Sequence, residues 1–239
     1  MLKLIHADLY KIFHRAYFFV MMLLISALCV GMIFALRGGT YGNWTGSAVL
    51  AVSLLSFPVI LLPMLTQIVS AEEYRDHTLK NTLSFGTNRT ALYVSKWLTS
   101  IILGVFLMVV VLAVYFGSSA LLLTKDAAFS GQVLHEFFVR LGASCSVYIA
   151  CISMSVFCIS LFNRSTLAIF LYYGAFYMTD LLLKLFHLSK GIDYLLKTQI
   201  SNIASKPLAQ LQTPVTISLI TMAVFFVAGL VFFRKKDLC

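Results

Sequence analysis

The feature that most constrains this chain is a series of six long apolar runs separated by shorter polar segments. Each run is close to the ~20 residues with which a helix crosses the roughly 30 Å hydrocarbon core of a bilayer. The runs are rich in Leu, Phe, Ile and Val and lack the alternation of a membrane-barrel strand. We therefore predict six membrane-spanning helices, over Ala16–Leu36, Gly46–Ala71, Trp97–Thr124, Phe137–Phe162, Thr166–Leu185 and Pro214–Phe233.

The composition excludes a water-soluble class of protein. Of the 239 residues, 60% are hydrophobic and only 11% are charged, and the mean hydropathy is +0.93. A soluble chain of this size needs many more charges to cover its surface. The predicted fold class is all-α, a polytopic membrane protein that forms a single transmembrane domain over residues 1–239.

The distribution of Lys and Arg predicts the orientation of the chain. With six spans, eleven of the 18 basic residues fall on the side of the two termini and seven on the other side. Loops rich in Lys and Arg stay in the cytoplasm, so both termini and the segment between spans two and three are predicted to be cytoplasmic. The net charge of +9 suits anionic lipid headgroups at the inner face and requires no nucleic acid.

The first 15 residues have the pattern of an amphipathic helix. Apolar residues recur at helical spacing, at Leu2, Ile5, Leu9 and Ile12 or Phe13. The polar positions among them are Lys3, Asp8, Lys11 and Arg15. This pattern is typical of a helix that lies in the membrane interface and leads into the first span. The alternative is that residues 1–15 are the frayed beginning of that span.

The second span contains two prolines, Pro58 and Pro63, in the stretch FPVILLP. A proline removes a backbone hydrogen bond and kinks a helix, which a membrane protein tolerates where neighbouring helices satisfy the freed carbonyls. The kinked span leads directly into a polar segment, so it is either a lever or a static bend.

The fourth span has small residues three or four positions apart, at Gly142, Ser146, Ala150 and Ser153. Small residues allow membrane helices to approach closely. We therefore predict that this span lies inside the bundle.

The fifth span combines an aromatic cluster with an acidic residue. Tyr173, Phe176 and Tyr177 lie in the stretch FLYYGAFY, and Asp180 and Lys184 follow, four residues apart. Aromatic rings offer contact area to an apolar cargo, and an acid within a span is costly and therefore a functional candidate. Tyr173, Phe176, Tyr177 and Asp180 are thus predicted to border a substrate path. The alternatives are lipid contact for the rings and an Asp180–Lys184 pair at the outer interface.

No catalytic machinery is predicted. The sequence has no Gly-x-x-x-x-Gly-Lys loop for nucleotide phosphates, no zinc-protease His pair and no Gly-x-Ser-x-Gly turn. Four of the five cysteines lie inside spans, where Cys behaves as a small hydrophobe. We therefore predict that the chain is not an enzyme and has no catalytic residue, metal site or cofactor of its own.

The most polar part of the chain is Ser70–Asn81, SAEEYRDHTLKN, which lies between spans two and three. It holds three of the nine acidic residues, interleaved with basic ones. The acids precede the bases, as suits the two ends of a short helix. A helix of mixed charge at the membrane surface suits docking to a soluble partner, and the alternative is a solvated linker.

This segment carries a resemblance to a known family. The pattern Glu-Glu-Tyr-Arg-Asp-x-Thr-Leu-Lys-Asn, followed by Leu-Ser-x-Gly-x-x-Arg and Tyr-x-x-Ser-Lys, resembles the region after span two in permeases of type-2 ATP-binding-cassette (ABC) exporters. The opening ADLYKIFHR is similar to the start of such permeases from Gram-positive bacteria. The motifs cover Met1–Arg15 and Glu72–Lys96, and the architecture of the whole chain agrees. Among these permeases, the chain most resembles those that give immunity to antimicrobial peptides such as lantibiotics or bacitracin.

The resemblance implies partners and sites. A cytoplasmic coupling segment, residues 72–96, docks on a separate ABC ATPase, present in two copies, which binds the ATP and Mg. A second permease subunit, identical or related, completes the export pathway in the bacterial cytoplasmic membrane, among membrane lipids, and residues 186–213 form an extracellular segment. The residues implied in coupling are Glu72, Glu73, Tyr74, Arg75, Thr78, Leu79 and, in the loop after span four, Arg164.

Two other functions are weighed against this one. An ion-coupled secondary transporter would use Asp180, but it predicts more charges within the membrane and an internal inverted repeat. A membrane sensor or docking subunit would bind partners without transporting anything.

Overall fold

The computed structural model describes residues 2–39, 41–75, 88–126, 129–162, 165–187 and 189–235, with backbone only for 71–75, 165 and 189–190. Within these ranges the chain consists of helices and short connections, without a β-strand, which confirms the all-α membrane fold. The helices are α1 Leu2–Phe13, α2 Ala16–Leu36, α3 Trp44–Ser53, the 3-10 turn η1 Leu54–Ser56, α4 Pro58–Arg75, α6 Arg89–Leu122, α7 Gly131–Leu161, α8 Ser165–Tyr173, the π-helical turn η2 Gly174–Met178, α9 Thr179–Leu185, α10 Ser189–Ile192, α11 Leu196–Ser205, the 3-10 turn η3 Leu208–Gln210 and α12 Gln212–Lys235.

Five helical stretches of the described chain are long and apolar enough to cross a membrane by themselves. A bent pair makes six when it is counted as one span, which agrees with the six predicted. The bent pair is Trp44–Ser56 with Pro58–Ser70, whose axes differ by 53°, so the kink predicted from the prolines is confirmed. Helix α6 begins at Arg89, which makes residues 89–96 the first turns of span three.

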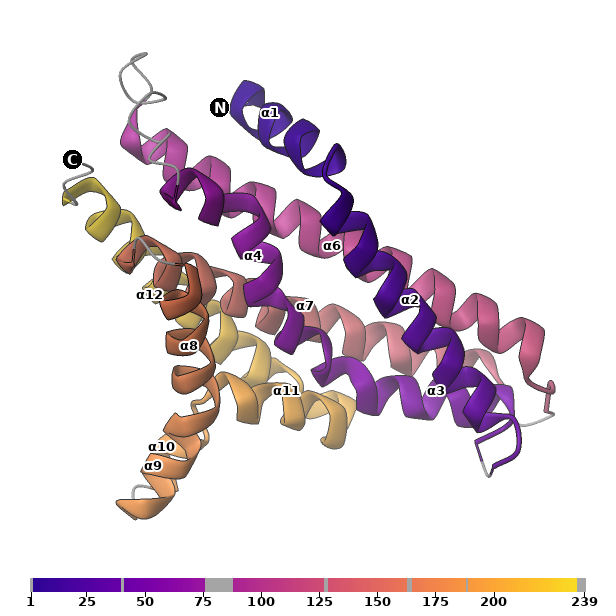
Figure 1. The fold of residues 1–239 in the computed structure, drawn as a ribbon. Helices are drawn as coiled ribbons and strands as arrows, with labels where there is room; N and C mark the ends of the chain where they lie inside the picture. The colour runs from indigo at the N-terminus through magenta and orange to yellow at the C-terminus, as the bar shows by residue number, and fades with distance from the viewer. Residues whose placement is uncertain are drawn as a thin grey trace.

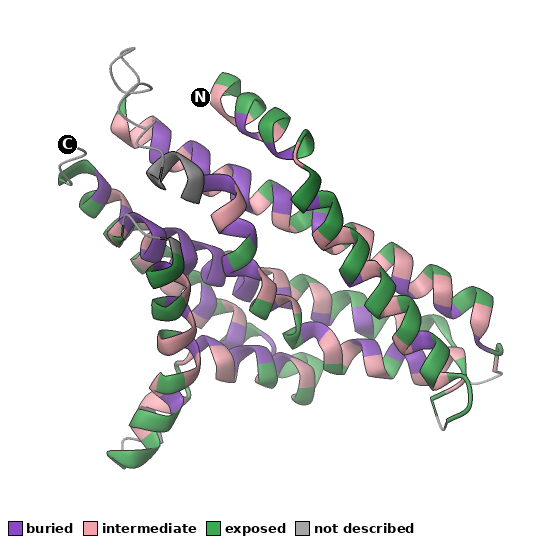
Figure 2. Ribbon diagram, in the orientation of Figure 1, coloured by how far each residue is buried: buried purple, intermediate pink, exposed green. Residues whose placement is uncertain are grey.

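Helix α7 is the centre of the bundle (Figures 1 and 2). In its most apolar window 78% of the residues are buried, against 11% for α2. Three of the four small residues of this span, Ser146, Ala150 and Ser153, are buried, whereas Gly142 is exposed. Helices α4, α8, α11 and α12 all pack against α7. The prediction that span four is internal is therefore confirmed.

Polar side chains fasten α7 to its neighbours. Trp97 Nε1 of α6 donates to Ser153 Oγ at 2.8 Å, and the hydroxyls of Thr66 in α4 and Ser155 in α7 lie 2.5 Å apart. Hydroxyl bonds between helices suit a membrane interior, where apolar contact alone does not favour helix over lipid. The serines that allow close packing on α7 thus also serve as hydrogen-bond partners.

Helix α1 packs on the beginning of α6. Lys96 Nζ donates to Asp8 Oδ1 at 2.7 Å, and the two side chains are only 9% and 8% exposed. The predicted helix is present, but the placement of Asp8 on its polar face is wrong, because Asp8 lies one turn from the buried Ile12 on the face that contacts α6. The position of α1 in the membrane interface stays a prediction.

The segment between spans five and six is largely helical in its described part. It contains α10, α11 and η3. Helices α8 and α9 with η2 lean away from the other long helices (Figure 1), and α10 packs on α9. The extracellular location of residues 186–213 stays a prediction.

A close contact between α6 and α12 generates the first testable prediction. A methyl group added at Gly229 would lie 2.0 Å from Tyr93 Oη. Tyr93 is 2% exposed and its ring packs against Phe226 and Phe233, so it has little room to move. Gly229→Ala should therefore cost about 1–3 kcal/mol of stability through overpacking, which would appear as a lower melting temperature of the detergent-purified protein.

The matched control is Gly31→Ala in α2, where an added methyl meets nothing within 4 Å. Both changes gain the same helix propensity, so their difference isolates the steric contact. Tyr93→Phe removes the oxygen nearest to the new methyl and should recover part of the loss in the Gly229→Ala background. Equal melting temperatures for the two alanine variants would contradict the packing described here.

Candidate functional site

The bend in span two leaves backbone carbonyls without their helical partners. In α-helical register the Val59 carbonyl would bond the N–H of residue 63, and in the 3-10 register of η1 the Leu55 carbonyl would bond that of residue 58. Both residues, Pro63 and Pro58, lack an N–H. Because the hydrocarbon region offers no water to replace these donors, the two carbonyls require partners from elsewhere in the protein.

Tyrosine hydroxyls from two other spans supply the missing donors. Tyr172 Oη of α8 donates to the Val59 carbonyl at 3.3 Å, and Tyr148 Oη of α7 donates to the Leu55 carbonyl. The two tyrosines are 1% and 6% exposed, so their bonds face little competition. The bent geometry of span two thus depends on α7 and α8.

A cavity of about 250 Å³ lies beside the bend. Its walls are formed by α2, α6, α7 and the junction of α3 and α4. The wall residues from the junction are Leu54, Leu55, Phe57 and Pro58. Tyr148, which bonds the bend, also lines the cavity, so one side chain belongs to both features.

The walls of this cavity are apolar. Among the described residues that line it, no side chain carries a carboxylate, imidazole, amine or amide. Its two hydroxyl groups, on Tyr115 and Tyr148, already donate to backbone carbonyls. Gly104 is the wall residue where α6 comes close to α7, since a Cβ there would lie 3.3 Å from Ile152 Cδ1. The arrangement can hold an apolar group, and its wall also includes the thiols of Cys29 and Cys145.

The predicted substrate-path aromatics form a separate cluster on α8 and η2. Phe176 is buried, and Tyr173 and Tyr177 are partly buried against the same core. Tyr173 Oη donates to the Ile60 carbonyl at 2.6 Å, next to the proline break. None of the three is a wall residue of the cavity, and their place in a substrate path stays a prediction.

Asp180 pairs with two lysines. The predicted partner, Lys184, lies 3.2 Å away, and Lys197 of α11 lies 2.9 Å away. The carboxylate side chain is 12% exposed, while Lys184 and Lys197 are 61% and 40% exposed. A carboxylate held between two exposed ammonium groups ties α9 to α11, which favours the interfacial interpretation of Asp180.

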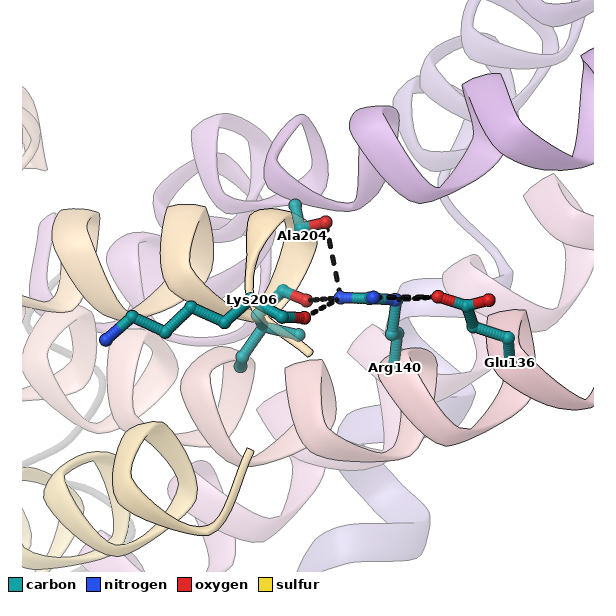
Figure 3. A network of polar contacts seen from close by, with 5 residues as sticks. Glu136, Arg140, Ala204 and Lys206 are labelled. Carbon is teal, nitrogen blue, oxygen red and sulfur yellow. Dashed lines mark hydrogen bonds and ion pairs between the residues drawn. The ribbon is translucent and has the colours of Figure 1, made fainter. Parts of the chain in front are cut away.

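Arg140 of α7 binds the end of α11 (Figure 3). Its Nη1 donates to the carbonyls of Ile203, Ala204 and Lys206 at 2.5, 3.2 and 2.8 Å, and its Nη2 lies 2.7 Å from Glu136 Oε1. The last carbonyls of a helix have no partner within the helix, and the dipole favours a cation there. Arg140 therefore fastens the segment between spans five and six to the central helix.

The residues implied in coupling fall into two groups. Four of them form the last turn of α4, Glu72, Glu73, Tyr74 and Arg75. The other three, Thr78, Leu79 and Arg164, lie outside the described residues. The backbone of α4 runs without interruption from Pro58 through this turn. The coupling role of all seven stays a prediction.

Comparison with known proteins identifies the family. The family model described as ABC-2 family transporter protein matches residues 4–179, which is most of the chain and includes every helix that lines the cavity. The chain belongs to the ABC-2 family. It is the transmembrane subunit of an ABC transporter, a type of subunit that lacks its own nucleotide-binding domain and acts with an ABC ATPase. No curated protein matches it.

Sequence reasoning on this permease missed the cavity and most of the contacts around it. Pro58 signalled a bend, but Tyr148 and Arg140 gave no signal of their own, because each acts on a residue at least 63 positions away. Lys197 was likewise not connected with Asp180. The prolines themselves are the cue that carbonyls in the second span need donors from elsewhere.

The bend generates the second testable prediction. Tyr172→Phe and Tyr148→Phe each leave a carbonyl at the proline break without its donor, at a cost of about 1–3 kcal/mol. The control is Tyr115→Phe, whose hydroxyl donates to the Ser47 carbonyl. Ser47 lies inside α3 and its carbonyl keeps its helical partner, so this change should cost only about 0.5–1.5 kcal/mol.

Thermal unfolding of the purified variants measures these costs. Tyr172→Phe and Tyr148→Phe should melt below Tyr115→Phe, although all three tyrosines are buried. The account of the bend fails if the control variant is the least stable of the three.

Proposed function

We propose that this permease exports an amphipathic or hydrophobic compound, such as an antimicrobial peptide in resistance or immunity, by coupling to a separate cytoplasmic ABC ATPase. Its membership of the ABC-2 family supports the class of transporter. The observation that carries the coupling is the continuity of α4, a single helix from the proline bend to Arg75. A partner that binds the polar end of this helix and moves it would also move the bend at its other end.

A stiff connection is required on energetic grounds. Shifting a pair of states from mostly inward-facing to mostly outward-facing takes about 5.5 kcal/mol of differential interaction. Closure of the ATPase can transmit this free energy to the membrane-spanning helices only through a rigid structural element. An α-helix joined to a span that α7 and α8 hold by hydrogen bonds meets that requirement.

The nature of the cargo is inferred from the membrane-spanning surfaces. The spans carry few charges, and polar side chains of α4 and α6 bond serines of α7 rather than facing open space. An apolar or amphipathic cargo therefore suits these surfaces better than a small polar one. Tyr173, Phe176 and Tyr177 are the proposed border of its path, in an assembly of two permease subunits and two ATPase subunits.

The third prediction tests the coupling segment. Glu73→Lys reverses a charge at the end of α4 that we propose lies against the ATPase, and it should weaken docking by about 2 kcal/mol or more if the contact is buried. The variant should still insert and fold, because the segment contributes little to the membrane core. The measurement is co-purification of the co-expressed ATPase, together with transport-coupled hydrolysis.

Asp193→Lys is the matched control. Asp193 is exposed and lies in the segment proposed to be extracellular, so its reversal should leave the complex intact. A complex that stays tight and active with Glu73→Lys, and also with a scrambled Ser70–Asn81, would make this segment a linker and would reject the proposal.

The fourth prediction concerns orientation, with both termini proposed to be cytoplasmic in a bacterial plasma membrane. Single cysteines replace Ser84 and Ser189 in a cysteine-free background. A membrane-impermeant thiol reagent applied to intact cells should label position 189 and spare position 84, which should react only after the cells are opened. The reverse pattern would overturn the proposed topology.

A further inference from the structure

We propose that the cavity beside the bend is a binding site for one acyl chain of a membrane lipid, which enters from the surrounding bilayer and packs against the bent part of span two. This site lies within a single permease subunit. It is independent of the cargo and of the ATPase, so it goes beyond the proposed export function.

The chemistry of the walls selects an apolar occupant. A buried water needs two to four polar partners, and apolar cavities of about 150 Å³ stay dry and take up small apolar molecules. The two hydroxyls on this wall, of Tyr115 and Tyr148, already donate to backbone carbonyls. With a volume of about 250 Å³, the cavity has room for a stretch of hydrocarbon chain.

The cavity has exposed wall residues on α2, on α6 and at the bend. Three of its wall residues, Leu28 of α2, Phe57 at the bend and Val105 of α6, are 67%, 48% and 52% exposed. Leu28 and Val105 belong to stretches that are long and apolar enough to cross a membrane, and Phe57 lies at the break of the bent pair, so we infer that the medium outside this opening is hydrocarbon. A group that enters here comes from the bilayer without passing through water.

Filling the cavity with an acyl chain is favourable for a simple reason. Wall atoms that face an empty space lose dispersion contacts. A lipid chain restores these contacts. The chain does not have to be transferred from water, because it comes from an apolar medium. The occupant would pack against Leu55 and Pro58, the turn where span two changes direction.

Buried wall residues of α7 provide a specific reporter. Tyr148 and Ile152 line the cavity but are only 6% and 2% exposed. Val147, on the same helix, is buried and does not line the cavity. Leu24 of α2 is 57% exposed and also lies outside the wall. A chain in the cavity reaches the first two, bulk lipid reaches Leu24, and neither reaches Val147.

The experiment uses the full-length permease in nanodiscs of phosphatidylethanolamine and phosphatidylglycerol. The probe is a phospholipid that carries a diazirine midway along one acyl chain, and adducts are located by peptide mass spectrometry after irradiation. We expect adducts at Tyr148 or Ile152 as well as at Leu24, and none at Val147. A phospholipid with the diazirine on its headgroup should not label Tyr148 or Ile152.

Two matched variants test whether the cavity itself is responsible. Gly104→Leu fills the cavity from α6, and Gly117→Leu adds the same side chain to an exposed position of that helix where nothing lies within 4 Å. The leucine side chain would occupy space that the acyl chain needs, so Gly104→Leu should lower the adducts at Tyr148 and Ile152 severalfold relative to those at Leu24. Gly117→Leu should label like the unmodified permease.

Cys29→Phe, which fills the cavity from α2, replaces Gly104→Leu if that variant fails to fold. The proposal is overturned if Leu24 is labelled while Tyr148 and Ile152 are not, because the cavity is then closed or empty in a bilayer. It is also overturned if the filled variants keep the α7 adducts. Neither result depends on ATP or on cargo, so the export function is tested separately.

Discussion

The structure depends on how the carbonyls at the bend of span two are satisfied. Pro58 and Pro63 remove two donors from a helix that has no water beside it, and a membrane interior does not tolerate unpaired backbone groups. Tyr148 and Tyr172 supply the replacements from α7 and α8. The bend is therefore a property of three spans together, and it fixes where the cavity lies and how the axis of α4 leaves the membrane.

Helix α7 makes this arrangement possible because it is central and lined with small residues. Its Ser153 accepts a hydrogen bond from α6, and its Ser155 is hydrogen-bonded to α4. Its Tyr148 donates to a carbonyl at the bend. Near its other end, Arg140 holds the last turn of α11. Helix α7 therefore contacts both α4 and the segment between spans five and six. A movement of α4 that starts at its polar end, as proposed, would act directly on α7.

Two ion pairs among the described residues join helices. The Asp8–Lys96 pair attaches α1 to α6, and Asp180 joins α9 to α11 through Lys197. In the buried Asp8–Lys96 pair, removal of one partner would leave the other charge poorly solvated, which costs more than the pair contributes. Glu136 pairs with Arg140 within α7 itself, beside the end of α11 that Arg140 binds.

The sequence by itself determined the class, the spans, the bend and the inward position of span four. Each of these follows from local rules, since apolar length sets a span, proline removes a donor and small residues allow close approach. The tertiary structure alone decided which groups replace the missing donors, that Asp8 is buried against Lys96, and that a cavity forms beside the bend. Those outcomes join residues 88 or more positions apart, from Asp8 to Lys96 and from Leu55 to Tyr148. The spacing of residues along the chain carries no record of such distant contacts, because they depend on how whole helices cross.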